Sequence, residues 1–270
     1  MGVLRAIGIA FLALLAVLLL LGFVGYLYYV NQLNQPKPQL VMDIPAGLYY
    51  KGPETTALAG YYCIENMNSS NGYSIQLNAM LDNRLWVQDV YAPAVSINGG
   101  PWQTAFLDNV WTQNVNGTPI FLHASNPSNN IANAPCAWLV IALKNGYVYF
   151  GYSLNGRSIT WYDSYPVNAD YIISTVPGLP LPIGYTNIAL AGPGNGEQAQ
   201  LNNALVYLAL YYWNGTTWVP AHTGIINGHG GILDTVNNAY VFTSGTCGGV
   251  VSWPNAVNET VCPSPPSFKP

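Results

Sequence analysis

The segment SIQLNAML, from Ser74 to Leu81, decides the fold because apolar and polar residues alternate along it. Its odd-numbered members are apolar, whereas Ser74, Gln76 and Asn78 on the other face are polar. A period of two is typical of a strand that buries one face. Further runs rich in aromatic and β-branched residues predict strands at 85–91, 104–112, 137–143, 147–152, 158–162 and 205–213.

Asparagine–glycine pairs separate several of these runs, as hairpin turns require. Asn145-Gly146, for example, lies between the strands expected at 137–143 and 147–152. Between residues 41 and 261 the sequence has neither a repeat nor a change of composition that would divide it into two domains. We therefore predict an all-β fold, a two-sheet sandwich with jelly-roll-like topology.

The composition is poor in charge. Lys and Arg number 7 against 11 Asp and Glu, so charged residues make up 7% of the chain, compared with about a quarter in an average domain. Such a chain lacks the basic surface that nucleic acid requires, and we expect no nucleic-acid partner. Because acid protonates few carboxylates here, folding should lose little stability as pH falls, which is compatible with an acidic exterior.

The N-terminal segment predicts a membrane anchor. Residues 6–30 carry no charge, and at 1.5 Å per residue they are long enough to cross a hydrocarbon core of about 30 Å. Arg5 on one side and a tyrosine cluster on the other favour a cytoplasmic N-terminus at residues 1–5. A cleaved signal peptide is the alternative. We expect a single-pass membrane protein whose C-terminal domain lies on the extracellular surface or a virion envelope, with the lipid bilayer as a partner.

The rest of the chain predicts a stalk, one domain and a tail. Residues 31–43 are polar and contain two prolines, which suits an extended extracellular stalk. Residues 44–261 would form the β-sandwich domain. Residues 262–270 are rich in proline, and we expect this tail to be unstructured.

The four cysteines form an even set without a CxxC pair, which argues against a zinc ribbon. In an oxidising exterior they predict two disulfides. Three connectivities are open, and proximity in sequence favours Cys247–Cys262, which leaves Cys63–Cys136. Four asparagines begin glycosylation sequons and are predicted acceptors in such an exterior domain: Asn68, Asn116, Asn214 and Asn258.

Several segments resemble the thermopsin family, acid peptidases of archaea. They are IPAGLYY (44–50), SIQLNAML (74–81), LWVQDV (85–90), FLDNVW (106–111), IALAGPGNGE (188–197) and ALYYWNG (209–215). The resemblance covers roughly residues 44–240 and implies a thermopsin-like acid peptidase, here as a membrane-anchored relative. Family members are usually secreted with a cleaved signal, and the position of Asp89 is more often an amide in relatives.

Acid hydrolysis of a peptide bond is most simply done by two carboxyls, or by a carboxyl and a carboxamide. One group activates water while the other protonates or polarises the carbonyl. Asp108 is the first candidate because it lies mid-pattern between Phe106 and Val110 on an apolar strand face, where a carboxylate needs a partner or a function. Glu197 is the second because it follows the glycine-rich stretch 192–196, where backbone can approach a substrate closely.

Gln76 and Gln88 lie on predicted strands and are the candidate amide partners. Asp89 directly follows Gln88 and must therefore point to the opposite face of the sheet. Each candidate also has a structural interpretation. Asp108 would accept hydrogen bonds from backbone or indole N–H groups, Glu197 would be an exposed loop carboxylate, and the glutamines would belong to ordinary polar strand faces.

The sequence has no pepsin-type Asp-Thr-Gly, no GxSxG and no HExxH motif, and we predict no cofactor and no metal site. His123, His222 and His229 lie in loop-like segments. A metal site in which His222 and His229 meet across a loop is the alternative to structural or solvent-exposed histidines.

Two functions from different classes follow. The first is a membrane-tethered acid endopeptidase that takes a peptide substrate and uses the candidate groups above. The second is a non-catalytic surface or envelope protein, cellular or viral, that uses the same sandwich to associate with copies of itself or with coat proteins, because aromatic, charge-poor faces suit such contacts.

Overall fold

The computed structural model describes residues 16–27, 39–41, 43–96, 102–113, 118–125, 134–179, 184–194, 196–226, 234–253, 257 and 262–270. The chain divides into two compact units, residues 1–37 and residues 38–270.

The described part of the first unit is a helix at residues 16–27. Among the described residues no helix combines the length and the apolar character needed to cross a bilayer. The prediction of a single-pass membrane protein with an anchor at residues 6–30 is therefore contradicted. The flanks of that segment, and residues 31–38 of the expected stalk, lie outside the described residues.

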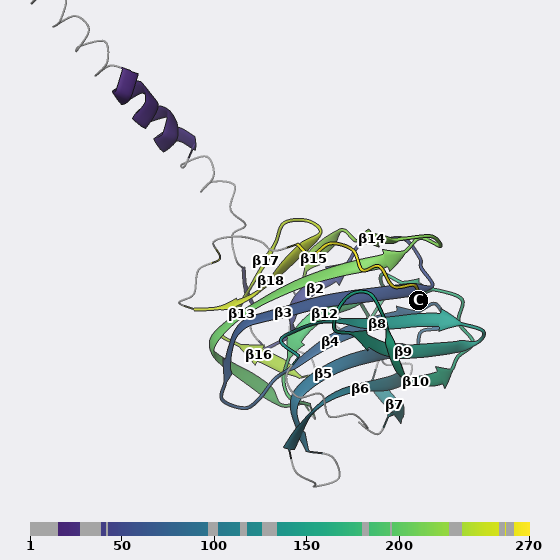
Figure 1. Cartoon of the computed structure of the whole chain (residues 1–270). Coiled ribbons are helices and arrows are strands. Elements are labelled where there is room, and N and C mark those ends of the chain that lie inside the picture. Colours follow the sequence, from purple (N-terminus) through teal and green to yellow (C-terminus); the bar gives the residue numbers. More distant parts are fainter. Residues whose placement is uncertain are drawn as a thin grey trace, which may run out of the picture. The chain divides into compact units, whose positions relative to one another are not determined.

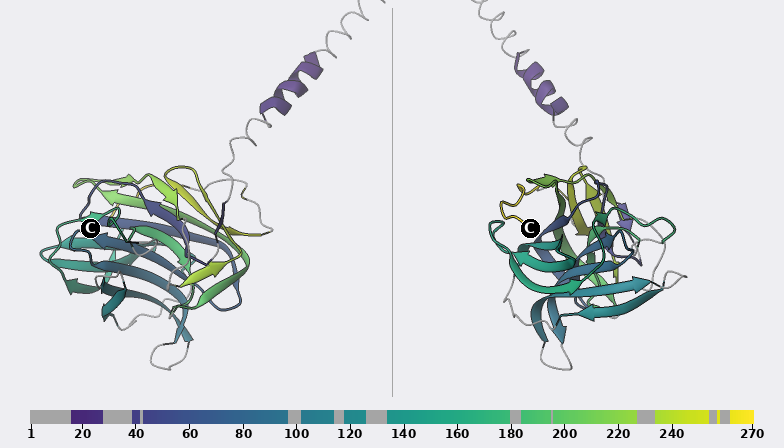
Figure 2. Two further views of the ribbon diagram at one scale, coloured as in Figure 1. Left: turned by 180° about the vertical axis from the view of Figure 1, so that it is seen from behind. Right: turned by 90° about the vertical axis from the view of Figure 1, so that its right-hand side faces the viewer.

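The second unit is built from two sheets, which can be followed in Figure 1 and, from behind and from the side, in Figure 2. In the first sheet the strands β14 (Trp218–Pro220) and β16 (Thr235–Asn237) pair with β13, and β16 runs parallel to it. The path of this ten-stranded sheet is β1 (Gln39–Val41), β17 (Ala239–Thr243), β18 (Cys247–Ser252), β13 (Gln198–Trp213), β3 (Ala57–Ser69), β8 (Cys136–Lys144), β9 (Tyr147–Ser153) and β10 (Thr160–Pro166).

The second sheet has eight strands. In it β11 (Ile172–Ile173) pairs with β4, and consecutive strands from β4 to β7 form a meander. The path of this sheet is β15 (Thr223–Ile225), β2 (Ala46–Tyr50), β12 (Asn187–Ala191), β4 (Ser74–Leu81), β5 (Trp86–Ser96), β6 (Trp102–Gln113) and β7 (Pro119–Ala124). The two sheets confirm the predicted all-β sandwich, and their strand order does not by itself establish a jelly roll.

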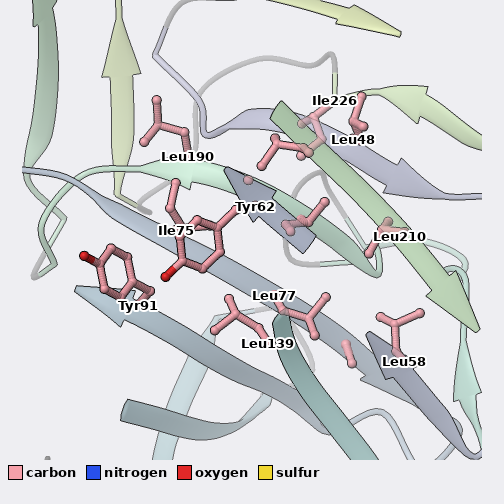
Figure 3. Packing of buried hydrophobic residues seen from close by; sticks show 14 of the residues in the cluster. Leu48, Leu58, Tyr62, Ile75, Leu77, Tyr91, Leu139, Leu190, Leu210 and Ile226 are labelled. Atoms are coloured by element: carbon pink, nitrogen blue, oxygen red, sulfur yellow. The ribbon is translucent and has the colours of Figure 1, made fainter. Parts of the chain in front are cut away.

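The main core lies between the two sheets. Ile75 and Leu77 of β4 meet Leu58 and Tyr62 of β3 and Leu139 of β8 in one buried cluster, as Figure 3 shows. The apolar face predicted for Ser74–Leu81 therefore does point into the core. The other face of β4 differs from the expected half-buried strand, because every residue of β4 is buried. The polar side chains on that second face consequently need hydrogen-bond partners inside the protein.

Both disulfides have the expected connectivity. Cys63–Cys136 links directly opposed residues of β3 and β8, and Cys247–Cys262 ties the C-terminal tail to β18. The tail is ordered, contrary to expectation. Phe268 packs edge-on against Trp138 and Trp218, and its carbonyl accepts a 2.8 Å hydrogen bond from the Trp218 indole N–H. A proline-rich sequence does not preclude docking when an aromatic residue finds an apolar site.

Candidate functional site

A network of side-chain amides covers the polar face of the eight-stranded sheet. Asn78 of β4 stands directly opposite Gln88 of β5 on one side and Asn187 of β12 on the other, so the three side chains share a face. Gln88 Nε2 donates to Asn78 Oδ1 at 2.7 Å, and Asn78 Nδ2 donates to Asn187 Oδ1 at 3.0 Å. These bonds explain how the amides can be buried on this face.

The network continues toward a carboxylate. Trp111 Nε1 donates to Gln88 Oε1 at 2.8 Å, Gln88 Nε2 donates to Gln76 Oε1 at 3.2 Å, and Gln76 Nε2 donates to Asp234 Oδ2 at 3.2 Å. Each donor in this series points the same way. Chains of aligned hydrogen bonds polarise one another. Asp234 Oδ2 therefore meets the positive end of the Gln76 amide dipole, strengthened by the donors behind it.

Asp234 is partly buried and lies immediately before β16. Its second oxygen, Oδ1, accepts a 2.8 Å hydrogen bond from the Gly196 N–H. Burial raises the pKa of Asp234 above its ordinary value, the hydrogen bonds from Gly196 and Gln76 act in the opposite direction, and the charge of Glu197 raises it further. Asp234 therefore keeps its proton to a higher pH than an exposed aspartate does.

Glu197 is exposed and lies immediately before β13. The parallel pairing of β13 with β16 aligns Gln198 with Thr235, and Thr235 N donates to the Glu197 carbonyl at 3.2 Å. This register brings Glu197 and Asp234 next to each other at the starts of two paired strands. The charge of Glu197 also acts on the Asp234 carboxyl, and a pair of neighbouring carboxyls is one arrangement that can carry out acid–base hydrolysis.

The glycine-rich stretch before Glu197 is needed for this approach. A Cβ atom on Gly192 would lie 1.9 Å from the Glu197 carbonyl oxygen, so the backbone can fold back only over a glycine here. Gly196 has a φ of 78°, in the left-handed region, and its N–H is the group that binds Asp234. The glycines thus let the backbone before Glu197 fold back toward Asp234, and the close approach to a substrate that the sequence predicted for this stretch stays a prediction.

The structure does not bring Asp108 into this group. Asp108 of β6 stands directly opposite Asp89 of β5, whereas Gln88 stands opposite Asn109. Since successive residues of a strand point to opposite faces, Asp89 and Asp108 lie on the face that also carries Leu77 and looks toward the other sheet. Of the four predicted site residues, Gln76 and Gln88 therefore belong to the polar-face network. Glu197 lies next to its end at Asp234, and Asp108 lies on the other face of the sheet.

A second cluster of titratable groups forms around Asp108. Asp89 is wholly buried and accepts hydrogen bonds from the Tyr162 hydroxyl at 2.7 Å and from Val140 N at 2.9 Å, while burial raises its pKa well above the ordinary value. Burial also raises the pKa of Asp108 to about 6. His123 Nε2 lies 3.9 Å from Asp108 Oδ2 and 2.8 Å from Asp163 Oδ2.

Sequence reasoning missed Asp234 and Asp163. Asp234 precedes a strand of only three residues, and its role depends on a parallel pairing that local pattern does not reveal. Asp163 lies in the aromatic run TWYDSYP of β10, in the same context as Asp108, so the rule that selected Asp108 would have selected it too.

The remaining predicted positions divide by exposure. Asn68 and Asn214 are exposed, so both can be reached by a glycan, and their glycosylation stays a prediction. His222 is exposed as well. Asn116, Asn258 and His229 lie outside the described residues, and the proposed meeting of His222 with His229 is therefore not tested.

The candidate site of the two-sheet domain is the end of the amide network, where Gln76 and Gly196 bind Asp234. The family model described as Thermopsin matches residues 137–225, from β8 to the end of β15. This match confirms the resemblance over about a third of the chain, and it suggests an acid-peptidase-type function. Glu197 lies inside the matched range, whereas Gln76, Gln88, Asp108 and Asp234 lie outside it.

The other comparisons add little. No curated protein matches the chain. One solved structure, described as the crystal structure of a functionally unknown protein from Saccharomyces cerevisiae, is similar with a TM-score of 0.30 and 11% sequence identity, over 52% of this chain and 69% of the other. At that TM-score no comparison of sites follows.

Proposed function

We propose that this protein is an acid endopeptidase in which the carboxyls of Glu197 and Asp234 activate water and protonate the scissile peptide. The observation that carries the proposal is the end of the amide network, where Gln76 and Gly196 hold Asp234 beside Glu197. The thermopsin match, which includes Glu197, supports the same reaction class.

The environments of the two carboxyls suggest their roles. Asp234 is partly buried and its pKa is raised, so it is the group that keeps a proton and donates it to the leaving amine. Glu197 is exposed and meets solvent, so it is the candidate base that takes a proton from the attacking water. A substrate carbonyl would lie between them.

Gln76 and Gln88 act as positioning residues in this proposal. A carboxamide has two N–H donors. Gln76 uses them on Asp234 Oδ2 and Ser74 Oγ, and Gln88 uses them on Gln76 and Asn78. Neither amide therefore has a donor left for the substrate, which favours a carboxyl pair over a carboxyl–carboxamide pair. The proposed steps use only groups of this chain.

The test is release of peptides from an unfolded protein substrate over a series from about pH 3 to about pH 6, because the general base must be ionised while the general acid still holds its proton. Glu197→Gln and Asp234→Asn should each lower kcat by at least about 100-fold, because general acid–base catalysis contributes that much. Glu54→Gln is the matched control, since Glu54 is exposed and away from the network. No release by the wild type, or equal release by all variants, would refute the proposal.

A non-catalytic assembly role is the second candidate, and one observation favours it. Strand β7 ends the path of the eight-stranded sheet, and its residues Ile120, Phe121 and Leu122 are 47%, 54% and 41% exposed. An exposed apolar edge strand is a usual place for pairing with another chain. Sedimentation of the wild type and of Phe121→Lys would reveal it, with dissociation expected only if β7 is an interface.

A further inference from the structure

We propose that Asp108, His123 and Asp163 form a binding site for one divalent transition-metal ion, of which Zn²⁺ is the leading candidate. The site is separate from the Glu197–Asp234 pair and does not depend on the peptidase proposal. The sequence analysis predicted no metal site, because the chain has no metal-binding motif and the convergence of distant ligands is not visible in a single sequence.

The three side chains come from three strands. Asp108 lies on β6, His123 on β7 and Asp163 on β10, which brings together parts of both sheets. Their potential ligand atoms all lie within 4.8 Å of one another. Metal–ligand bonds of about 2.0–2.2 Å hold tetrahedral neighbours roughly 3.3 Å apart, so small side-chain adjustments would close the three groups around one ion.

The state of the Asp108 carboxyl is the second and independent observation. Its side chain has no exposed surface, and neither oxygen makes a hydrogen bond of normal geometry among the described residues. The nearby Ser125 hydroxyl lowers the pKa of Asp108, but burial outweighs this effect and leaves the pKa raised. A buried carboxylate without partners is costly. His123 Nε2, at 3.9 Å from Asp108 Oδ2, is the nearest basic side-chain nitrogen in the described part of the chain, and it already lies 2.8 Å from Asp163 Oδ2.

The charges and donor types fit a divalent ion. Two carboxylates and a neutral imidazole carry a total charge of −2, which a divalent ion would neutralise, whereas one protonated histidine would neutralise only half of it. Asp163 uses Oδ1 to accept a 2.8 Å hydrogen bond from Ser164 N, and Oδ2 is the atom that faces His123. An imidazole among the ligands favours Zn²⁺ and similar transition metals over Mg²⁺ and Ca²⁺, which prefer oxygen ligands.

An ion can reach this site, and its position predicts a structural effect. The side chains of His123 and Asp163 are 31% and 24% exposed, so one side is open to solvent for entry and for a bound water. Strands β7 and β10 end the paths of the eight- and ten-stranded sheets (Figure 1). Metal bonds would therefore tie the margins of the two sheets together, and binding to the folded state would raise its stability.

The experiment uses the full chain, stripped with a chelator and titrated with Zn²⁺ by calorimetry near neutral pH, with thermal unfolding and Co²⁺ absorption as second readouts. We expect one ion per chain and a higher Tm with Zn²⁺. His123→Gln and Asp163→Asn should weaken binding by at least about 100-fold, because each removes a direct ligand. His222→Gln and Asp170→Asn are the matched controls, being exposed residues elsewhere on the domain.

Asp108→Asn alters a fully buried group, so circular dichroism should first establish that this variant folds. The partly exposed His123 and Asp163 keep the test valid if it does not. Absence of Zn²⁺ binding by the wild type would overturn the proposal, leaving a metal-free His123–Asp163 ion pair. Unchanged binding by His123→Gln and Asp163→Asn would overturn it as well, because the ion would then sit elsewhere.

Discussion

Asp234 shows how a single side chain depends on its neighbours. Burial raises its pKa, whereas the hydrogen bonds from Gln76 and Gly196 lower it, and the balance leaves it raised. The protonation of this carboxyl is therefore set by groups that need not touch a substrate.

Gln76→Leu removes the donor that faces Asp234 Oδ2. The pKa of Asp234 should rise further, because the carboxylate form loses a hydrogen bond. We expect a lower kcat, a small change in KM, and an alkaline limb of the pH–rate profile displaced to higher pH. Leu107→Ala is the control, because Leu107 lies on the neighbouring part of the sheet in β6 and takes no part in the network; it should leave the position of that limb unchanged. An unmoved limb in Gln76→Leu would contradict the positioning role.

Asp234→Asn should alter the pH dependence of stability. A carboxyl whose pKa is raised on folding binds more protons in the native state, so its contribution is present below the ordinary pKa of 3.8 and is lost as pH rises through the raised value. In Asp234→Asn the side chain does not ionise, so the free energy of unfolding does not fall in this way as pH rises. Urea unfolding at several pH values should show its stability improving relative to the wild type from acid toward neutral pH. A difference that is constant or falls with pH would count against the raised pKa.

At the level of elements, sequence pattern predicted the strands that have a clear period or flanking turns. The expected strand at 147–152 corresponds to β9 (Tyr147–Ser153), and that at 137–143 to β8 (Cys136–Lys144). Strand β13 begins at Gln198, seven residues before the expected 205, because its first part is rich in amides and alanine and is held by pairing with β3 and β16. Long-range pairing of this kind is not encoded in local pattern.

The same limit applies to the candidate site. Alternation along β5 correctly separated Gln88 from Asp89, since it depends only on chain geometry. The partner of Glu197 could not be found in this way. Asp108 is a buried carboxyl, as the apolar context suggested, but the faces of the sheet place it with Asp163 rather than with Glu197. Which carboxyls meet is decided by sheet order.

The C-terminal tail offers a test at the element scale. Phe268 is 5% exposed and packs on Trp138 and Trp218. Phe268→Ala should destabilise the domain by about 3 kcal/mol, the usual lower value for truncating a buried phenylalanine. Lys269→Ala, at an exposed neighbouring position, should have almost no effect. Urea denaturation measures both, and equal effects would mean that the tail is not docked in solution.

The two disulfides should contribute unequally. Cys63 and Cys136 are 73 residues apart, whereas Cys247 and Cys262 are 15 apart. In the chain-entropy description, closing the longer loop stabilises by about 4 kcal/mol and closing the shorter one by about 3 kcal/mol. The double serine variant at Cys63 and Cys136 should therefore unfold at lower urea than the one at Cys247 and Cys262. The opposite order would contradict this expectation.

The whole molecule is held together with few charges. Among the described residues, the ion pairs are those of His123 with Asp108 and Asp163, so no lysine or arginine pairs with a carboxylate there. Acid therefore has few favourable charge pairs to break, in keeping with 7% charged residues in the chain. The fold relies on apolar burial and amide hydrogen bonds, whose strength does not depend on carboxylate ionisation.

Acid tolerance is the corresponding prediction. The Tm measured by circular dichroism should differ by only a few degrees between about pH 6 and about pH 3, where ordinary carboxylates become protonated. Asp234, with its raised pKa, acts in the stabilising direction over this change. A domain that unfolds at about pH 3 and room temperature would show that charged interactions outside the described residues carry its stability.

The pairing of β3 with β13 also bears on how the chain acquires its structure during synthesis. Ser69 pairs with Leu201, so almost half of the polypeptide must emerge from the ribosome between the two halves of this ladder. Contacts so distant in sequence make folding slow, and the nascent β3 would wait with its edge uncovered. Cys63 and Cys136 are both available before Leu201 is made, and early oxidation would hold β3 against β8 during that interval.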